Sequence, residues 1–298
     1  MILPILYALL LTHSIICVSA DRPTNIMHAK TWDDIFKAFD PRSEVIEEQY
    51  KAHVAQQLLP IAHHAIRSVP IVDNNERLVD IRNTKHPRIS MLPNAPDGQP
   101  FAGPQYNAGF EHSSKMRHTL WVSLVKMIKH LDGLSPSCGY QPGSLSIKVF
   151  EGLRDLESQQ KLFDNKLAEI KKQNPSMTDE AADRETATWV SPTENNVPAH
   201  STGAAIDIRL WNSSTKDFVD TGTFGVIWGP NDNAHTFSAN TTPTQKRNRL
   251  LLLTAADRAG LTNYTYKHWH FSTGDRYAVY WQEKDARKRQ AHYGPAQS

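Results

Sequence analysis

The sequence predicts an α+β fold in which a small, mostly antiparallel sheet is flanked by helices. Two patterns support this prediction: long stretches whose apolar residues recur every three to four positions, and short stretches in which apolar and polar residues alternate. The chain has 298 residues, 39% of them hydrophobic, which is enough for one large domain with a sizeable core. No internal repeat and no convincing interdomain linker interrupts it.

Residues 1–20 are predicted to be a secretory signal peptide, followed by a single domain over residues 21–298. The apolar run ends in the small residues Val18-Ser19-Ala20 and polar Asp21 follows, although the usual Lys or Arg is missing from its start. The run is short for a membrane span, so an uncleaved anchor is the less favoured alternative. We therefore expect an exported protein, periplasmic or secreted, without a membrane association after cleavage.

Charge and cysteine content exclude several classes of protein. The formal net charge is only +2 and no block of Lys or Arg stands out, so nucleic-acid binding has no electrostatic support. Of the two cysteines, Cys17 would leave with the signal peptide, and Cys138 alone cannot form an internal disulfide.

The mature chain is predicted to begin with helices, followed by two strands and an irregular segment. Residues 31–68 show helical periodicity, with Asp40-Pro41 as a plausible helix start, so residues 21–68 form an N-terminal helical extension. Residues 69–81 are typical of two strands around a turn. Residues 83–107 are rich in Pro, Gly and Asn and are predicted to be an irregular excursion that covers the core or rims a cleft.

The middle of the chain shows the clearest elements. Residues 113–131 carry one apolar stripe and are predicted to be a helix, and residues 144–150 alternate as a strand does. A second helix is expected from Leu156 to near Asn174, where Pro175 follows. Residues 177–196 are polar and charged and are predicted to be a surface insertion that could wall a cleft.

The last third alternates strand, loop, helix and strand. Residues 204–211 are predicted to be a strand and residues 217–240 a long loop. Residues 244–260 have the pattern of a helix, and residues 264–272 are predicted to be the final strand.

Two short stretches carry the residues with metal-binding chemistry. The first contains His200 and, seven positions on, Asp207; the second contains His268 and His270. Residues two apart on a strand point to the same side, so the last two imidazoles are expected to share a face. Two His and one Asp, with a fourth position left for water, are the ligand set of a catalytic zinc.

Three blocks of sequence resemble the D-alanyl-D-alanine dipeptidases of the VanX type, in peptidase family M15. The first is Val149-Phe150-Glu151-Gly152-Leu153-Arg154, the second runs from His200 to Asp207, and the third includes His268-Trp269-His270. The likeness covers residues 69–281. It implies a fold of the hedgehog and DD-peptidase kind and an enzyme that hydrolyses D-Ala-D-Ala or a related small peptide from peptidoglycan.

The resemblance also assigns roles to individual residues. It implies that His200, Asp207 and His270 bind one zinc ion per chain, and the chemistry of two imidazoles and one carboxylate agrees. It implies that Arg154 contacts the substrate and stabilises the charge developing on the scissile carbonyl oxygen. Glu151 is expected to orient Arg154 and to help bind the substrate. The alternative for Arg154 is an ordinary salt bridge to Glu151 or Asp155.

The chain departs from the dipeptidase pattern beside the last ligand. The family's general base is a Glu three residues before that ligand, and Lys267 stands there in this sequence. The His-x-His pattern of His268 and His270 is similar to that of lysostaphin-type endopeptidases, whose first His assists catalysis. We favour His268 as the residue that handles protons. The alternatives are an acid such as Glu194, or a site that keeps zinc with weak or lost catalysis.

Two further functions stay open. The His-x-His pattern also suits an endopeptidase or carboxypeptidase acting on the peptidoglycan stem, and Lys267 suits a zinc-retaining binding module.

Overall fold

The computed structural model describes residues 27, 29–38, 43–92, 112–222 and 232–297. The predicted signal peptide lies outside these residues, as do Asp40-Pro41 and much of the predicted irregular excursion. Within the described part of the chain, no helix has both the length and the apolar character needed to cross a membrane.

One mixed sheet of six described strands forms the centre of the fold, and all but one of its pairings are antiparallel. The strand β2 runs parallel to β4, and β6 pairs with β5 beside the main path. Along that path the order is β2 (Ile89–Met91), β4 (Leu145–Glu151), β5 (Ala205–Asn212), β8 (His270–Ser272) and β7 (Thr262–Asn263), with β6 at Asp217–Phe218. The predicted α+β class, with a small and mostly antiparallel sheet, is confirmed.

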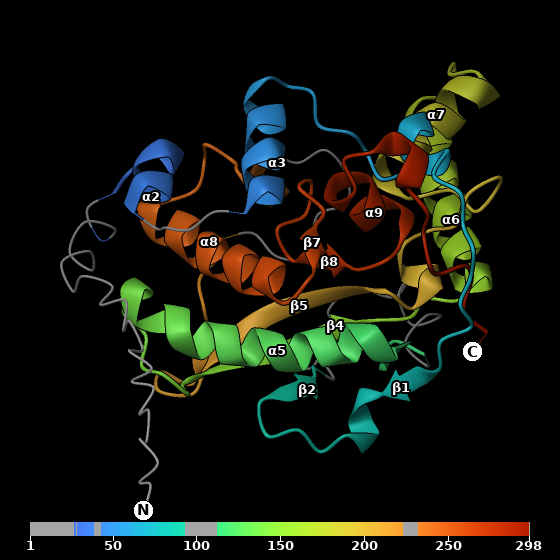
Figure 1. Ribbon diagram of the computed structural model, residues 1–298. Coiled ribbons are helices and arrows are strands. Elements are labelled where there is room, and N and C mark those ends of the chain that lie inside the picture. Colours follow the sequence, from blue (N-terminus) through green and yellow to red (C-terminus); the bar gives the residue numbers. More distant parts are fainter. Residues whose placement is uncertain (1–26, 28, 39–42, 93–111, 223–231, 298) are drawn as a thin grey trace, which may run out of the picture.

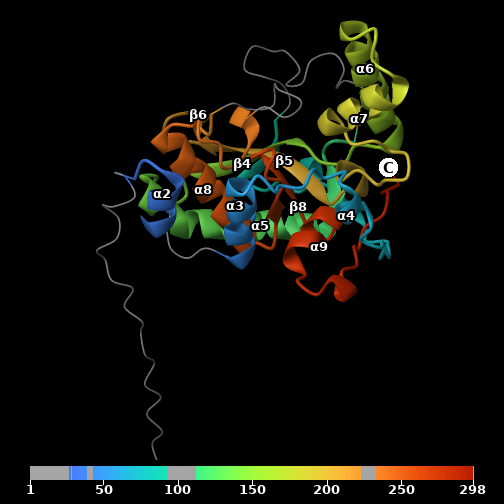
Figure 2. The ribbon, with the colours of Figure 1, turned by 90° about the horizontal axis from the view of Figure 1, so that it is seen from above.

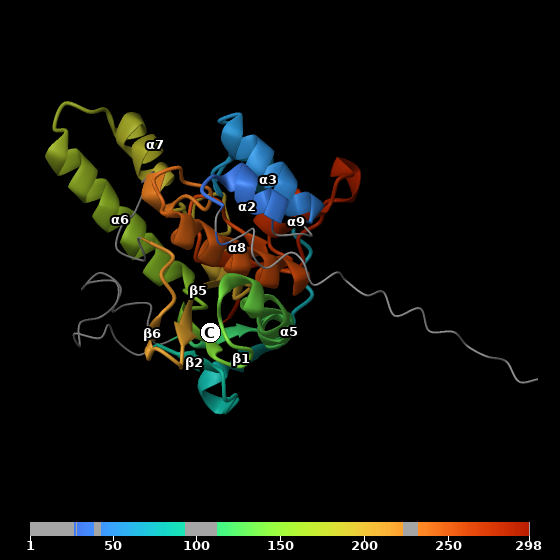
Figure 3. The ribbon, with the colours of Figure 1, turned by 90° about the vertical axis from the view of Figure 1, so that its left-hand side faces the viewer.

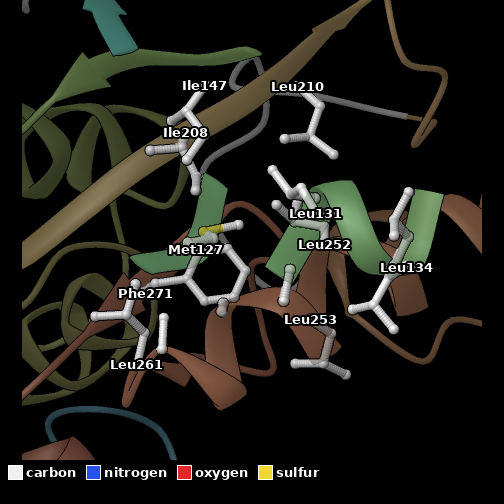
Figure 4. Packing of buried hydrophobic residues seen from close by; sticks show 14 of the residues in the cluster. Met127, Leu131, Leu134, Ile147, Ile208, Leu210, Leu252, Leu253, Leu261 and Phe271 are labelled. Atoms are coloured by element: carbon white, nitrogen blue, oxygen red, sulfur yellow. The ribbon is translucent and has the colours of Figure 1, made fainter. Parts of the chain in front are cut away.

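Two long helices cover one face of this sheet (Figure 1). They are α5 (His118–Leu134) and α8 (Pro243–Arg258). Figure 4 shows Ile147 and Ile208 of the sheet facing Met127 and Leu252 of the helices across the core. Because each large aliphatic side chain contributes about 1.5–3 kcal/mol when fully buried, this layer holds the sheet to the helices.

The start of α8 follows from local sequence. Thr242 caps the helix by accepting a hydrogen bond from the backbone N–H of Gln245, whose side chain accepts from the N–H of Thr242 in return. Pro243 occupies the first turn, where its missing N–H costs nothing.

The first two N-terminal helices, α2 (Trp32–Ala38) and α3 (Glu44–Val54), pack on the same core. Ser43 caps α3, and its hydroxyl donates a hydrogen bond of 2.7 Å to Asp257 at the end of α8. Figure 3 shows α2 and α3 lying along α8, so these two helices extend the core by a further layer. The short α4 (His64–Arg67) instead contributes Ile66 to a second apolar cluster with Tyr277 and Trp281.

A pair of helices projects from the other end of the molecule (Figure 2). They are α6 (Leu156–Gln173) and α7 (Asp179–Trp189), and α7 occupies the stretch predicted to be a polar insertion. Thr178 caps α7, and Lys166 of α6 lies 4.1 Å from the ring centre of Trp189. The charged residues therefore form the outer face of a helix, while Ala182 and Thr186 face inward.

Several short elements differ from the sequence prediction. A separate two-stranded sheet pairs β1 (Leu78–Asp80) with β3 (Lys115–Arg117), and β3 occupies what was predicted to be the first turn of α5. The helix α9 (Arg276–Gln282) follows β8. The predicted strand over residues 264–272 is wrong for its first six residues, because residues 265–266 and 268–269 form turns and β8 begins at His270.

Cys138 is expected to be inert in the native protein. Its thiol is buried at the end of a 3₁₀ turn after α5, and burial raises the pKa of the thiol to about 12. The thiolate is the reactive form of cysteine. In a protein of residues 21–298, iodoacetamide at pH 8 should therefore modify Cys138 at least about 100-fold more slowly in the folded than in the unfolded state. Mass spectrometry over time measures both rates, and equal rates would contradict the buried position.

Candidate metal centre

The face of the sheet opposite the helices carries polar side chains at its centre. In β5, Ile206 and Ile208 point into the core, so the intervening Asp207 points to the other side. In β8, Phe271 points into the core and the preceding His270 to the other side. The register pairs Asp207 with His270 and, on its other flank, with Glu151 of β4. The alternation that builds the core therefore also brings these three side chains together.

His200 reaches the same place from the turn before β5. A 3₁₀ turn, His200–Thr202, is followed by Gly203 with a φ of 69°, a left-handed conformation that lets the chain turn into the strand. The imidazole Nδ1 of His200 lies 2.8 Å from the carbonyl oxygen of Gly152. This contact fixes the ring, because a histidine with one nitrogen on a carbonyl presents its other nitrogen in a set direction.

His200, Asp207 and His270 form a compact, buried cluster. Their potential ligand atoms all lie within 4.8 Å of one another. Asp207 Oδ1 is 2.7 Å from His270 Nδ1 and 3.4 Å from His200 Nε2. His270 Nε2 is buried without a hydrogen-bond partner among the described residues. A buried nitrogen with no partner, next to a carboxylate between two imidazoles, fits a divalent cation, and the donor set suits zinc.

The charge states at the cluster suit metal binding. Burial opposes ionisation of Asp207, but the imidazoles of His200 and His270 outweigh it and hold the pKa of the carboxyl below its ordinary value. Burial lowers the pKa of His270 to about 4, although Asp207 opposes this shift. The cluster therefore presents a carboxylate and a neutral imidazole, which are the protonation states that bind metals.

Arg154 lies beside the cluster and is held by two partners. Its guanidinium donates hydrogen bonds to both carboxylate oxygens of Glu151 and a third bond of 2.7 Å to Oε1 of Gln159. Gln159 is in turn fixed by its bond of 2.6 Å to the carbonyl oxygen of Ser191. The salt bridge that the sequence left as an alternative is therefore present, and a two-bond pair of this kind fixes the guanidinium plane. The role of Arg154 in substrate binding stays a prediction.

A pocket opens in front of the cluster. Arg154, His200 and His270 line it on one side. Pro60 to Ala62, from the segment between α3 and α4, and Ala187 to Ser191, at the end of α7, form further walls. Part of the predicted insertion thus borders the pocket. Glu194, a candidate acid in the sequence, is exposed and is not among the described residues that line it.

Lys267 lines this pocket together with Tyr264 and Tyr266. A partial signal for this wall exists in the sequence, because aromatic residues stand at alternate positions just before Lys267. Burial lowers the pKa of Lys267, while the negative charges of Asp207 and Glu151 oppose the shift. The residue at the position of the family's general base therefore faces the cluster.

His268 lies in a different environment from His270. The expectation that both imidazoles share a face is wrong, because residues 268–269 form a turn in which the N–H of His270 bonds to the carbonyl oxygen of Lys267. His268 Nε2 lies 3.0 Å from Thr221 Oγ1, and Nδ1 lies 3.4 Å from the carbonyl oxygen of Ala234. Burial and the charge of Arg249 hold the pKa of His268 well below its usual value. Its role in proton transfer stays a prediction.

Residues 141–287 match the family model Peptidase_M15, described as D-Ala-D-Ala dipeptidase. The comparison with curated proteins gives no significant match.

Three solved structures give matches at 16% identity. A vancomycin-resistance D,D-pentapeptidase, VanY, in complex with Zn(II) is matched over 59% of this chain and 83% of that chain, with a TM-score of 0.32. VanYB in complex with D-Alanine-D-Alanine is matched over 58% and 81%, with a TM-score of 0.32. The LD-carboxypeptidase LdcB is matched over 60% and 71%, with a TM-score of 0.34.

Proposed function

We propose that this chain is a zinc peptidase that hydrolyses D-Ala-D-Ala or a related small peptide from peptidoglycan. The match of residues 141–287 to the M15 peptidase family model supports this proposal. The observation that carries the proposal is the buried cluster of His200, Asp207 and His270 at the base of a pocket. The three residues would hold one zinc ion. When bound, the ion would act as a Lewis acid toward a peptide carbonyl group.

The chain's own residues would bind and orient the peptide. Glu151 and Gln159 hold the guanidinium of Arg154 at the pocket wall, where it can donate hydrogen bonds to a carbonyl oxygen that gains charge or to a carboxylate of the peptide. The rings of Tyr264 and Tyr266 line the pocket and would give a bound peptide an apolar surface to pack on.

Two residues are candidates for the general acid or base of the reaction. We assign this role to His268, as the His-x-His pattern suggests, and Lys267 is the competing candidate because it lines the pocket. With zinc present, His268→Ala should lower kcat for D-Ala-D-Ala by at least about 100-fold, the usual contribution of a general acid or base. Lys267→Ala should leave kcat within a few-fold.

The assay needs controls for folding and for metal content. His292→Ala, which changes an exposed histidine, should behave as the unaltered chain does. Each variant is checked for zinc content and thermal unfolding, so that a loss of kcat is not a loss of the fold. If His268→Ala were fully active and Lys267→Ala inactive, Lys267 and not His268 would be the general acid or base.

The same zinc-loaded protein can be used to test two alternative functions. A chain that holds one zinc yet hydrolyses no peptide would be a binding module, which Lys267 in the pocket favours because its ammonium group is a poor base. A chain that cleaves only longer stem peptides would be an endopeptidase or carboxypeptidase. A series of peptides of increasing length, assayed with and without zinc, distinguishes these outcomes.

We also propose that the chain is exported after cleavage behind Ala20, which leaves residues 21–298 as one domain with an N-terminal extension. N-terminal sequencing of the secreted protein tests this proposal, with Asp21 expected as the first residue.

A further inference from the structure

A second cavity, with a volume of about 550 Å³, lies beside the pocket at the metal centre. Its size falls within the range of about 300–1,000 Å³ that is typical of sites for small organic ligands. The residues that line it are Trp32, Tyr50, His53, Val54, Gln56, Leu58, His235, Phe237, Ala239 and Tyr266. Neither the predicted roles nor the peptidase chemistry uses this cavity.

The cavity and the pocket are neighbours. Tyr266 lines both. The segment that leaves α3 also borders both, since Gln56 and Leu58 line the cavity and Pro60 to Ala62 line the pocket. The two spaces are therefore adjacent, and a molecule bound in both would pass Tyr266.

The aromatic walls of the cavity are held in fixed orientations. The ring of Phe237 packs edge-on against Trp32, at a centroid distance of 5.4 Å, and against Tyr50, at 5.3 Å. The polar groups of Trp32 and Tyr50 form hydrogen bonds to residues that do not line the cavity. Trp32 Nε1 donates to the carbonyl oxygen of Ser238, and the hydroxyl of Tyr50 donates to Asp33. Tyr266 donates its hydroxyl to the carbonyl oxygen of Leu58. Trp32 and Phe237 are themselves almost fully buried, so the ring surface that a ligand can reach is that of the partly buried Tyr50 and Tyr266, which these contacts hold in place.

The lining of the cavity carries no Lys, Arg, Asp or Glu among its described residues. A neutral ligand is therefore favoured over a carboxylate or phosphate. The side chains of His53 and Gln56 add polar groups to the aromatic walls, whereas Nε2 of His235 is buried. A purely apolar ligand would cover these groups without hydrogen bonds, which is unfavourable. A pyranose ring suits both features, since its C–H face packs on aromatic rings and its hydroxyl and acetamido groups bond at its edge.

We propose that this cavity binds an N-acetylated sugar of a peptidoglycan fragment whose peptide end lies in the pocket at the metal centre. The inference rests on the proposed function and adds a substrate class to it. It also explains the N-terminal extension: Trp32, Tyr50 and His53 lie outside the matched residues 141–287, and they supply one side of the cavity.

The first test measures sugar binding alone. Triacetylchitotriose is titrated into the zinc-loaded chain, residues 21–298, by calorimetry. Ala239→Trp is the main variant, because Ala239 is exposed and lines the cavity, so that an indole there would fill the space without removing a core contact. We expect the chain to bind the probe and Ala239→Trp to bind it at least about tenfold more weakly. Gln57→Ala, at an exposed neighbour that is not among the lining residues, should bind as the unaltered chain does.

The second test compares one stem peptide, free and attached to its disaccharide. The attached form should have a KM at least about tenfold lower, and Ala239→Trp should remove this advantage while leaving the KM of the free peptide unchanged. Absence of chitotriose binding, or equal binding by Ala239→Trp, overturns the sugar site. Failure of all peptide hydrolysis together with chitotriose binding that Ala239→Trp weakens would overturn the proposed function and leave the sugar site standing.

Discussion

Asp207→Asn is expected to abolish zinc binding and, with it, peptide hydrolysis. Asp207 supplies the only negative charge in the cluster and lies between two imidazoles, 2.7 Å from His270 and 3.4 Å from His200. Asparagine keeps the shape and one acceptor oxygen but removes that charge. Since the loss of a group that merely supports a metal ligand costs 10–100-fold in affinity, loss of a charged ligand should weaken zinc binding by at least about 100-fold.

The measurement is zinc affinity by competition with a chromophoric chelator, with zinc content after dialysis as a second reading. Zinc should also raise the Tm of the unaltered chain, because a ligand that binds only the folded state stabilises it, and Asp207→Asn should lose this shift. Asp164→Asn, on the exposed face of α6, is the matched control and should retain both properties. An Asp207→Asn chain that holds one zinc with unchanged affinity would show that the cluster is not the metal site.

The longer elements of the fold could be predicted because their patterns are local. The strands β4 and β5 alternate over seven and eight residues, and their inward residues form the core seen in the structure. The start of α8 could also have been read from Thr242 and Gln245, which stand three residues apart before an apolar run. The strands β2 and β7 span three and two residues, too short for any periodicity, and only their partners make them strands.

In the candidate site, too, some side-chain directions follow from local sequence patterns and others do not. Asp207 and His270 lie on regular strands opposite core residues, so alternation predicts their direction. The direction of His268 depends instead on a turn held by distant residues. Its N–H bonds to the carbonyl oxygen of Ala234, and the side chain of Asn263 donates to the carbonyl oxygens of Lys267 and His270. No pattern within residues 264–272 encodes these contacts.

The pocket walls are also products of tertiary structure. Segments near Pro60 and near Val190 both line the pocket, although about 130 residues (190 minus 60) separate them in the sequence. The polarity of residues 177–196 indicates a possible wall, but no pattern in the sequence indicates that the segment after α3 also lines the pocket.

Gly152→Ala is expected to destabilise the fold and to displace a metal ligand at once. A Cβ atom at Gly152 would lie 2.6 Å from the carbonyl oxygen of Lys115 and 2.7 Å from that of Ser113, both closer than real side chains approach. Neither oxygen can move freely, because each also accepts a hydrogen bond from this segment, from the N–H of Leu153 and of Gly152 respectively. Overpacking of this kind costs about 1–3 kcal/mol.

The carbonyl oxygen of Gly152 also contacts His200 Nδ1 at 2.8 Å, so the shift that relieves the clash would move the imidazole. Denaturant unfolding should therefore show a loss of at least about 2 kcal/mol, accompanied by weaker zinc binding. Gly133→Ala is the matched control: Gly133 is exposed near the end of α5 with nothing within 4 Å of its Cβ position, so alanine there should be neutral or stabilise by up to about 1 kcal/mol. Unchanged stability and unchanged zinc affinity in Gly152→Ala would contradict the close packing of Gly152 against residues 113–115.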